Sequence, residues 1–433
     1  MAGADTTTVG NILQQQYLPG ITTQFNGSAP NLRYVRQNSK TLNAEGTEAE
    51  IAVEIGYNES TGFHGESADV PDSGYPTIKK VKVSTKQMSA RARITYLLMR
   101  RARTQAASFA RGAQLQMTST RNGFTLTANG YLWGDGTGVM CRVKSQTLTA
   151  SRKMKFDRAF GLSDGGAPEY TIRVGQTIQL LDTKGYTDGV STVRGKGVIE
   201  AVDRNTGTAG EIEVTIKAGH TLDAANTAAG DYVYLQNTIK GLTDSGETQD
   251  NRPWMGFLGF YDDAQAGTLQ SITTADDPWW KPNKVAVAEA TVIKDMRRAF
   301  NLAEKRGGQG QKEGMIAYLI SSYETQERFV AALDAKVEFR NVKTVDGYWT
   351  SLVYNGKPWF KDHTAPDARV FFKPAGNVME RHASDDFINF VNDGRDVLHQ
   401  VPNKTVFDAI LTCIAEYGIR RRENLVSTTG MNW

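Results

Sequence analysis

Two runs of the chain alternate apolar with polar residues, at residues 78–83 and 90–96. A period of two is typical of strands with one buried face, so each run predicts a strand. The polar residues 84–87 between them predict that the two strands form a hairpin. Residues 33–76 are polar and contain many glycines, which predicts a long exposed loop. Residues 1–32 have only a short helical pattern, which predicts an N-terminal arm.

The longest helical pattern of the chain follows, at about residues 98–128. When residues are placed about 100° apart, the apolar side chains gather on one side. Gly112 and Gly123 weaken the prediction that the helix is continuous. Opposite the apolar side, four arginines fall within an arc of about 80°; they are Arg100, Arg103, Arg111 and Arg121. We predict that this basic face lies near DNA or acidic neighbours, and the alternative is that it only solvates the helix.

Residues 150–238 consist of short alternating strands separated by Gly, Asp, Asn and Thr, which predicts a small β-barrel or sandwich inserted in the chain. A helix is expected next, at about 285–305. The apolar run 315–320 predicts a buried strand, and Ser321 with Glu324 has the spacing of a capping box at the start of another helix. Strand patterns return towards the C-terminus. The whole pattern predicts a mixed α+β fold with a β-rich insertion.

Composition excludes several classes of protein. The chain has 433 residues and a net charge of +3. No run approaches the roughly 20 apolar residues of a membrane span, and the first residues lack the blocks of a signal peptide. We therefore expect a soluble, unsecreted protein with no membrane partner. Cys141 and Cys413 are the only cysteines, too few for a disulfide framework.

Positive charge is concentrated in one segment. No acidic residue lies between Asp72 and Asp135, whereas eleven Lys and Arg residues do. Such a block is expected to attract polyanions or acidic protein surfaces.

The stretch "GDGTG" contains Gly134, Gly136 and Gly138 and raises the question of a phosphate-binding loop. A phosphate loop lies between a strand and the start of a helix, so that amide groups converge on the anion. This stretch instead follows the predicted helix and precedes a strand pattern. We interpret the three glycines as a structural turn and not as a nucleotide site.

Other candidate chemistry is sparse. The five histidines are scattered and match no metal-binding spacing, so we expect no metal site. Asp362, His363 and Asp367 lie close together in "KDHTAPD", but no nucleophile motif accompanies them. We interpret this segment as a surface turn. We therefore expect no catalytic residues, no cofactor and no enzyme activity.

The order of these features resembles the major capsid proteins of tailed bacteriophages, which have the Hong Kong ninety-seven fold. The polar loop "IGYNESTGFHGESADVPDSG" and "TKQMSARARITYLL" resemble the extended loop and the approach to the spine helix of that family. "ANGYLWGDGTGVMCRV" is similar to the end of the spine helix. "YLISSYETQERFVAAL", "YNGKPWFKD" and "CIAEYGIRRRENLV" are similar to axial-domain and closing-strand segments. The resemblance covers most of the chain.

The resemblance implies a division of the chain into regions. They are an N-terminal arm (1–32), an extended loop (33–76), peripheral strands with the spine helix (77–134), an axial domain with returning peripheral strands (135–149 and 239–415), a β-rich insertion (150–238) and a C-terminal segment (416–433). The insertion resembles domains that only some family members have. Because little precedes the arm, any scaffolding protein is expected to be a separate chain.

The function implied is structural. Many copies would assemble as pentamers and hexamers into an icosahedral shell that encloses double-stranded DNA through non-specific contacts. The resemblance implies a portal and permits a decoration protein as further partners, with the virion as location and the host cytoplasm as the place of assembly. One alternative is an encapsulin-like compartment that holds protein cargo. A less favoured alternative is a nucleotide-using or hydrolytic enzyme built around residues 134–138 or 362–367.

Overall fold

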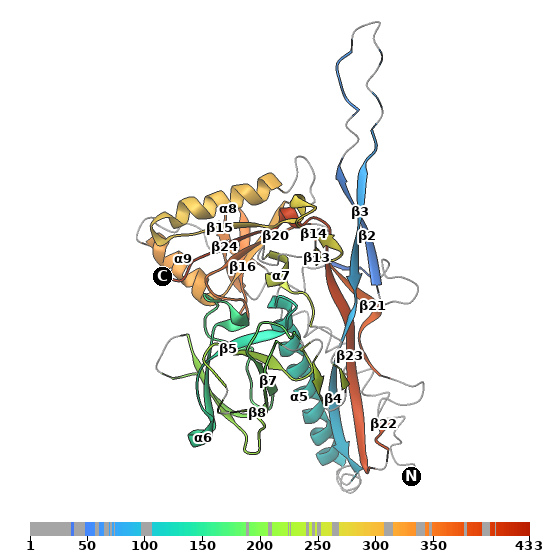
Figure 1. Ribbon diagram of the computed structural model, residues 1–433, viewed down its shortest axis with the longest axis vertical. Helices are drawn as coiled ribbons and strands as arrows, with labels where there is room; N and C mark the ends of the chain where they lie inside the picture. The colour runs from blue at the N-terminus through green and yellow to red at the C-terminus, as the bar shows by residue number, and fades with distance from the viewer. Residues whose placement is uncertain are drawn as a thin grey trace.

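The computed structural model has a mixed α+β fold with few helices and many strands. It describes residues 36–38, 48–56, 60–64, 69, 72, 74–96, 106–187, 190–206, 210–223, 225, 227–239, 242–244, 247–248, 253–261, 268–306, 315–334, 343–345, 349–375, 379–391, 399–402 and 404–433. The arm predicted at residues 1–32 lies outside the described residues. Figure 1 shows a long sheet, a barrel beside it, and a second sheet flanked by helices.

The long sheet is organised around β23 (Val406–Ile419). One edge of β23 pairs antiparallel with β4 (Lys86–Thr95), and the other edge pairs with β21 (Met379–Phe390) and β22 (His399–Gln400). The short strand β1 (Arg36–Asn38) adds to β21 in parallel. Alternate residues of β23, such as Leu411 and Cys413, are buried, as expected for a strand with one face on the core.

A two-stranded ribbon extends from this sheet (Figure 1). It consists of β2 (Glu48–Gly56) and β3 (Thr77–Ser84), paired antiparallel. The hairpin predicted at residues 84–87 does not form: only Thr85 separates β3 from β4, and the two strands continue end to end. The reason is that each strand has a more distant partner, β2 for β3 and β23 for β4. Local alternation predicts a strand but not its partner.

The long helix α5 (Ala106–Trp133) is continuous through Gly112 and Gly123. Its buried residues Met117, Phe124 and Ala128 recur at helical spacing, and the helix contacts β4. The beginning of the predicted helix, at residues 98–105, lies outside the described residues.

A closed barrel follows α5, in the strand order β10-β5-β6-β9-β8-β7. The barrel begins at Val139, earlier than the boundary of 150 expected from the sequence, because β5 pairs with both β6 and β10 and is needed to close it. Closure leaves no free strand edge. The barrel strands are β5 (Val139–Thr147), β6 (Lys153–Asp157), β7 (Thr177–Leu181), β8 (Val193–Asp203), β9 (Ile212–Ile216) and β10 (Tyr232–Leu235), with the short helices α6 (Leu148–Ser151) and η2 (Ala159–Gly161) between them.

The remaining sheet has seven strands in the order β15-β24-β20-β16-β19-β18-β17. We call it the axial sheet; its strands are β15 (Asn283–Ala286), β16 (Ile316–Ser321), β17 (Lys343–Val345), β18 (Trp349–Tyr354), β19 (Lys357–Lys361), β20 (Val370–Pro374) and β24 (Val426–Thr429). Small elements connect the parts of the chain: β11 (Thr243–Asp244), β12 (Glu247–Thr248), α7 (Phe257–Tyr261), β13 (Thr268–Leu269), β14 (Ile272–Thr273), η3 (Pro278–Trp280), η4 (Glu289–Thr291) and η6 (Arg422–Asn424).

The helices α8 (Val292–Arg306) and α9 (Tyr323–Asp334) pack beside the axial sheet (Figure 1). The helix predicted from residue 285 begins at Val292, because residues 283–286 form β15 and pair with β24. The capping residue of α9 is Ser322 and not Ser321: the Thr325 amide donates to Ser322 Oγ at 3.1 Å, whereas the indole of Trp359 donates to Ser321 Oγ at 2.9 Å.

Arg422 joins three segments in the core. Its side chain is fully buried, with a relative exposure of 0%, and its guanidinium donates to the carbonyl oxygens of Gly259 at 3.0 Å, Phe260 at 3.0 Å and Trp280 at 3.3 Å. Two of these carbonyls belong to the short helix α7, where terminal carbonyls lack helical partners. Arg422 therefore ties the end of β23 to α7 and η3.

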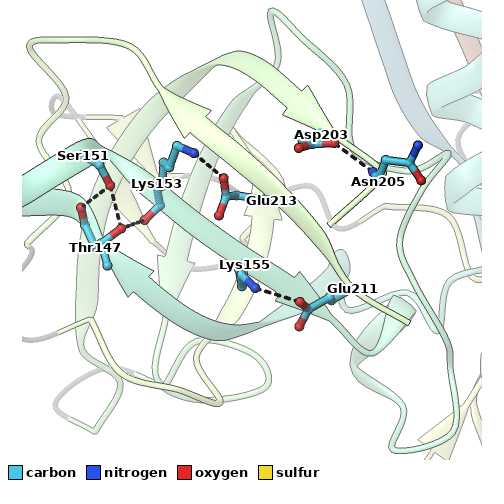
Figure 2. Close-up of polar contacts among 8 residues, drawn as sticks. All are labelled: Thr147, Ser151, Lys153, Lys155, Asp203, Asn205, Glu211 and Glu213. Atoms are coloured by element: carbon cyan, nitrogen blue, oxygen red, sulfur yellow. Dashed lines mark hydrogen bonds and ion pairs between the residues drawn. The ribbon is translucent and has the colours of Figure 1, made fainter. Parts of the chain in front are cut away.

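Charged pairs cover one outer face of the barrel (Figure 2). Lys153 pairs with Glu213 at 2.5 Å and Lys155 with Glu211 at 2.8 Å, between β6 and the start of β9. Glu211 also pairs with Lys144 of β5 at 2.7 Å, and its side chain is buried. Hydrogen bonds from Lys144 and Lys155 lower the pKa of Glu211 to about 2.

We predict that Arg422→Lys lowers the free energy of unfolding by about 3 kcal/mol or more. A lysine cannot reproduce the three-way geometry, and each buried carbonyl left without a donor costs about 1–3 kcal/mol. Urea denaturation of the variant measures this loss. Arg421→Lys, at the half-buried neighbouring position, is the control and is expected to change stability by less than about 1 kcal/mol. Wild-type stability in Arg422→Lys would contradict the role given to this side chain.

We predict that Glu211→Gln lowers the thermal unfolding midpoint near pH 7, and that this difference from wild type shrinks as pH falls from about 4.5 to about 2. Because the folded-state pKa is depressed, ionised Glu211 stabilises the fold fully above the unfolded-state value and loses that effect on acidification. Circular dichroism melts at several pH values test this. Glu213→Gln removes a more exposed pair and is expected to have a smaller effect. A difference independent of pH would refute the prediction.

Candidate assembly and nucleic-acid interface

The glycine turn lies where α5 ends and β5 begins. Gly136 and Gly138 have positive φ angles of 79° and 88°, the left-handed region that favours glycine. The Asp135 carboxylate accepts hydrogen bonds from the Thr137 amide, at 3.0 Å, and from the Thr137 hydroxyl, which closes the turn locally. Gly134, Gly136 and Gly138 thus belong to one turn, and the element after it is a strand and not a helix.

Protein atoms occupy the space next to this turn. A Cβ atom on Gly136 would lie 3.0 Å from Met255 Cε, and one on Gly138 would lie 3.2 Å from the Thr238 carbonyl oxygen. Asp135 also pairs with Lys184 of the barrel at 2.5 Å. The turn is a packed junction between α5, the barrel and the segment before α7. The acidic side chain of Asp135 lies in this turn, where a phosphate-binding loop would need hydrogen-bond donors.

An aromatic cluster lies beside this junction. The ring centroid of Trp133, the last residue of α5, lies 5.0 Å from that of Phe257 and 5.3 Å from that of Phe371. Tyr261 stacks on Phe257, with ring centroids 5.8 Å apart. Buried aromatic rings of this size contribute strongly to packing. They join α5, α7 and β20 into one core.

Part of the basic block between Asp72 and Asp135 is paired with carboxylates of the chain itself. Six of its side chains form ion pairs with carboxylates that are distant in sequence or on the neighbouring strand β2. The pairs are Lys79 with Asp277, Lys80 and Lys82 with Glu50, Lys86 with Glu416, and Arg91 and Arg93 with Asp408. These six cations share four carboxylates, so their charge is partly balanced within the chain, and the attraction of polyanions by this block stays a prediction.

Two of these pairs fasten β4 to β23. Arg93 donates to both carboxylate oxygens of Asp408, at 2.7 and 2.9 Å, and this bond lowers the pKa of Asp408. Lys86 pairs with the buried Glu416 at 2.5 Å and also donates to the Pro253 carbonyl at 2.8 Å. Burial raises the pKa of Glu416, and the adjacent Lys86 opposes that rise. These charges hold the sheet together and are not free to bind a partner.

The four arginines of the predicted basic helix face cannot be assessed together. Arg100 and Arg103 lie outside the described residues, and the side chain of Arg111 is not among those described. Arg121 is half-buried, and its Nε atom is buried without a hydrogen-bond partner. The DNA-facing role of this face stays a prediction.

The interpretation of residues 362–367 as a surface turn is wrong for Asp362, which is only 1% exposed. Its carboxylate accepts hydrogen bonds from the Thr364 amide at 2.9 Å and the Thr364 hydroxyl at 2.7 Å. The Asn129 side chain of α5 also donates to Thr364 Oγ1, at 2.5 Å. The segment is buried because this polar network fastens α5 to the loop after β19.

The His363 side chain is not hydrogen-bonded to Asp362. The His363 Nδ1 atom lies 3.9 Å from Asp362 Oδ1, beyond hydrogen-bond distance. Burial raises the pKa of Asp367 to about 7, and Glu324 adds to that rise.

Among the described residues, no group of three or more His, Cys, Asp or Glu side chains is placed to hold a metal ion. None of the helices described is long and apolar enough to cross a membrane.

Two features were missed by the sequence reasoning. Arg422 lies within "RRREN", but nothing in that string distinguishes the one fully buried arginine from its half-buried neighbours. The second feature is a row of basic residues along α8, Lys294, Arg297, Arg298 and Lys305. The last three of these residues follow Lys294 by three, four and eleven positions, a spacing that places side chains on one face of a helix and that could have been recognised in the sequence.

No protein-family model matches the chain, and no curated protein matches it by sequence. Solved structures do match over nearly its whole length. The capsid asymmetric unit of cyanophage A-1(L) is similar with a TM-score of 0.50 at 10% identity, covering 94% of this chain and 93% of that chain. The capsid of a native GTA particle has a TM-score of 0.45 at 9% identity, covering 92% and 88%.

An encapsulin complex from Synechococcus elongatus PCC 7942 has a TM-score of 0.36 at 7% identity, covering 92% of this chain and 86% of that chain. Of the three structures, the cyanophage capsid alone is similar enough to establish a shared fold. The expected fold class is confirmed: the chain has the fold of a tailed-phage capsid protein, with an inserted β-barrel.

We predict that Gly136→Val lowers the free energy of unfolding by about 2–3 kcal/mol, because a β-branched residue is strained at positive φ. Gly123→Ala is the matched control: nothing lies within 4 Å of its Cβ position inside α5, so it should stabilise the helix by about 0.5–1 kcal/mol. Chemical denaturation compares the two variants. Calorimetry that detects specific nucleotide binding to wild type, lost in Gly136→Val, would overturn the interpretation of the turn as structural.

Proposed function

We propose that this protein is the major structural subunit of a tailed-phage capsid. The observation that carries the proposal is the similarity of fold to the cyanophage A-1(L) capsid over nearly the full length of both chains. In this proposal many copies assemble as pentamers and hexamers into an icosahedral shell around double-stranded DNA. The chain works by forming interfaces and not by catalysis.

The ribbon of β2 and β3 supports a role in assembly. Beyond its paired strands, Phe63 is fully exposed and Tyr75 is largely exposed, and Ile78 within β3 is also exposed. Several large apolar side chains exposed on one projecting segment favour a site that becomes buried in a complex. A neighbouring subunit that covers the ribbon would bury them, and symmetric oligomers repeat such a contact at every subunit.

The remaining partners follow from the same proposal. They are a separate scaffolding protein and a portal, and the proposal permits a decoration protein. Packaged DNA contacts the inner surface without sequence preference. The protein resides in the virion and assembles in the host cytoplasm. A compartment with protein cargo is the second candidate, and the contents of the particles distinguish it.

We predict that the expressed chain, alone or with its scaffolding partner, forms capsomers or shells visible by negative-stain electron microscopy. The double variant Phe63→Ser and Tyr75→Ser should lose assembly while its unfolding midpoint stays within a few degrees of wild type, since both side chains are exposed. Val174→Ser with Val190→Ser, on the barrel surface, is the matched control. Sedimentation that shows only monomers under every condition would refute the capsid role, and wild-type particles that exclude nucleic acid would favour a cargo compartment.

A further inference from the structure

One face of α8 carries a row of exposed cations. Lys294, Arg297, Arg298 and Lys305 are all exposed, and Asn301 lies in the same row. Residues three, four, seven and eleven apart lie along one side of a helix, so the row extends for about 16 Å at 1.5 Å per residue. We call these five residues the α8 stripe. Figure 1 shows α8 on the side of the axial sheet that faces away from the barrel.

The cations of the α8 stripe have no ion-pair partner among the described residues. This distinguishes them from most other basic clusters of the chain. The lysines and arginines of β3 and β4 pair with Glu50, Asp277, Asp408 and Glu416, and those of the barrel face pair with Glu211 and Glu213. These four cations, without an ion pair among the residues that the structure describes, form one exposed positive row.

The stripe lines a groove of about 640 Å³. The groove is open, and its lining comes from α8 and the residues just before it: Ala290, Thr291, Ile293, Lys294, Arg297, Arg298 and Asn301. A carboxylate already lies beside the N-terminus of α8, because Asp295 in its first turn accepts hydrogen bonds from the Thr291 hydroxyl at 2.5 Å and the Ala288 amide at 3.4 Å. An anion in the groove would therefore be bound by the basic side chains and not by the helix terminus.

We propose that the α8 stripe binds the phosphate backbone of double-stranded DNA, an inference that rests on the proposed capsid function and names the surface that faces the genome. A row of Lys and Arg with an amide donor matches a regular array of phosphates and reads no bases. An acidic protein segment is the other polyanion to consider. Protein interfaces depend on buried aromatic or large apolar anchors, and this groove offers only Ala290 and Ile293.

The test uses the unassembled full-length chain and a linear double-stranded DNA fragment of mixed sequence. The triple variant Lys294→Gln, Arg297→Gln, Arg298→Gln removes three charges from the stripe. The matched control, Lys217→Gln, Lys281→Gln, Lys404→Gln, removes three exposed charges elsewhere. Affinity is measured across a salt series by fluorescence anisotropy, with poly-glutamate as a second probe.

In the stripe variant, DNA affinity at low salt should fall at least about ten-fold. The slope of the logarithm of the binding constant against the logarithm of the salt concentration should decrease in magnitude by about 2 to 3, because each lost phosphate contact contributes about 0.9. The control should keep at least most of the wild-type slope. Equal losses in both variants, an unchanged slope in the stripe variant, or tighter binding of poly-glutamate than of DNA would each overturn the proposal.

The same two variants are then assembled with the wild-type partners. The stripe variant should still form shells, with a lower fraction of DNA-filled particles than the control. If it loses assembly while the control assembles, the stripe faces another protein and the proposal is wrong. If wild type itself forms no particles, the capsid role fails, whereas the salt series still decides whether the stripe binds DNA.

Discussion

The pairing of β23 along both edges is the constraint on which the rest of the structure depends. A central strand must satisfy its backbone donors and acceptors on each side. One edge of β23 is satisfied by β4, which leads from the projecting ribbon towards α5, and the other by β21 and β22. Glu416 and Asp408 on β23 then pair with Lys86 and Arg93 of β4, so hydrogen bonds and charges fix the same register.

At the end of β23, Arg422 reaches α7, and α7 packs against Trp133 at the end of α5. One strand thus connects the ribbon, the long helix and the axial core.

Charge has two roles in this chain, and they are separated in space. The basic residues of β3 and β4 and those of the barrel face find carboxylates within the chain, and their contribution is to register and stability. Internal pairing explains how a segment without acidic residues can lie within a stable sheet. The α8 stripe is different because its cations project from a helix that buries its opposite side through Met296 and Phe300. The same residue types therefore support the fold in one place and remain available to a polyanion in another.

Local patterns in the sequence predicted the strands, the long helix and the inserted β unit. The spacing of apolar residues and the presence of turn residues can both be read from neighbouring positions in the chain. They did not predict the partners of strands. Residues 84–87 resemble a hairpin turn, yet β4 pairs with a strand more than three hundred residues further on. The helical pattern is expected to begin at Val285, yet Val285 and Ala286 lie in β15 and pair with β24 near the C-terminus. The burial of Asp362 depends on its hydrogen bond with Thr364, two residues away, and on the bond from Asn129 of α5 to Thr364. The sequence around Asp362 cannot reveal the contact with Asn129, which is distant in the chain. Which cations pair within the chain depends on tertiary contacts, and for this reason the internal ion pairs of the basic block could not be read from the local sequence.

The end-to-end arrangement of β3 and β4 has a mechanical consequence. Tension on the projecting ribbon along its axis passes through Thr85 into β4, which lies antiparallel to β23 from Thr95 opposite Val406 to Lys86 opposite Ala415. The ladder hydrogen bonds run perpendicular to the strands, so this tension loads them in shear. All the bonds between the two strands then resist together, whereas a force that peeled β4 sideways would break them one after another. In the proposed capsid, a neighbouring subunit that pulled on the ribbon along its axis would meet this joint resistance of β4 and β23.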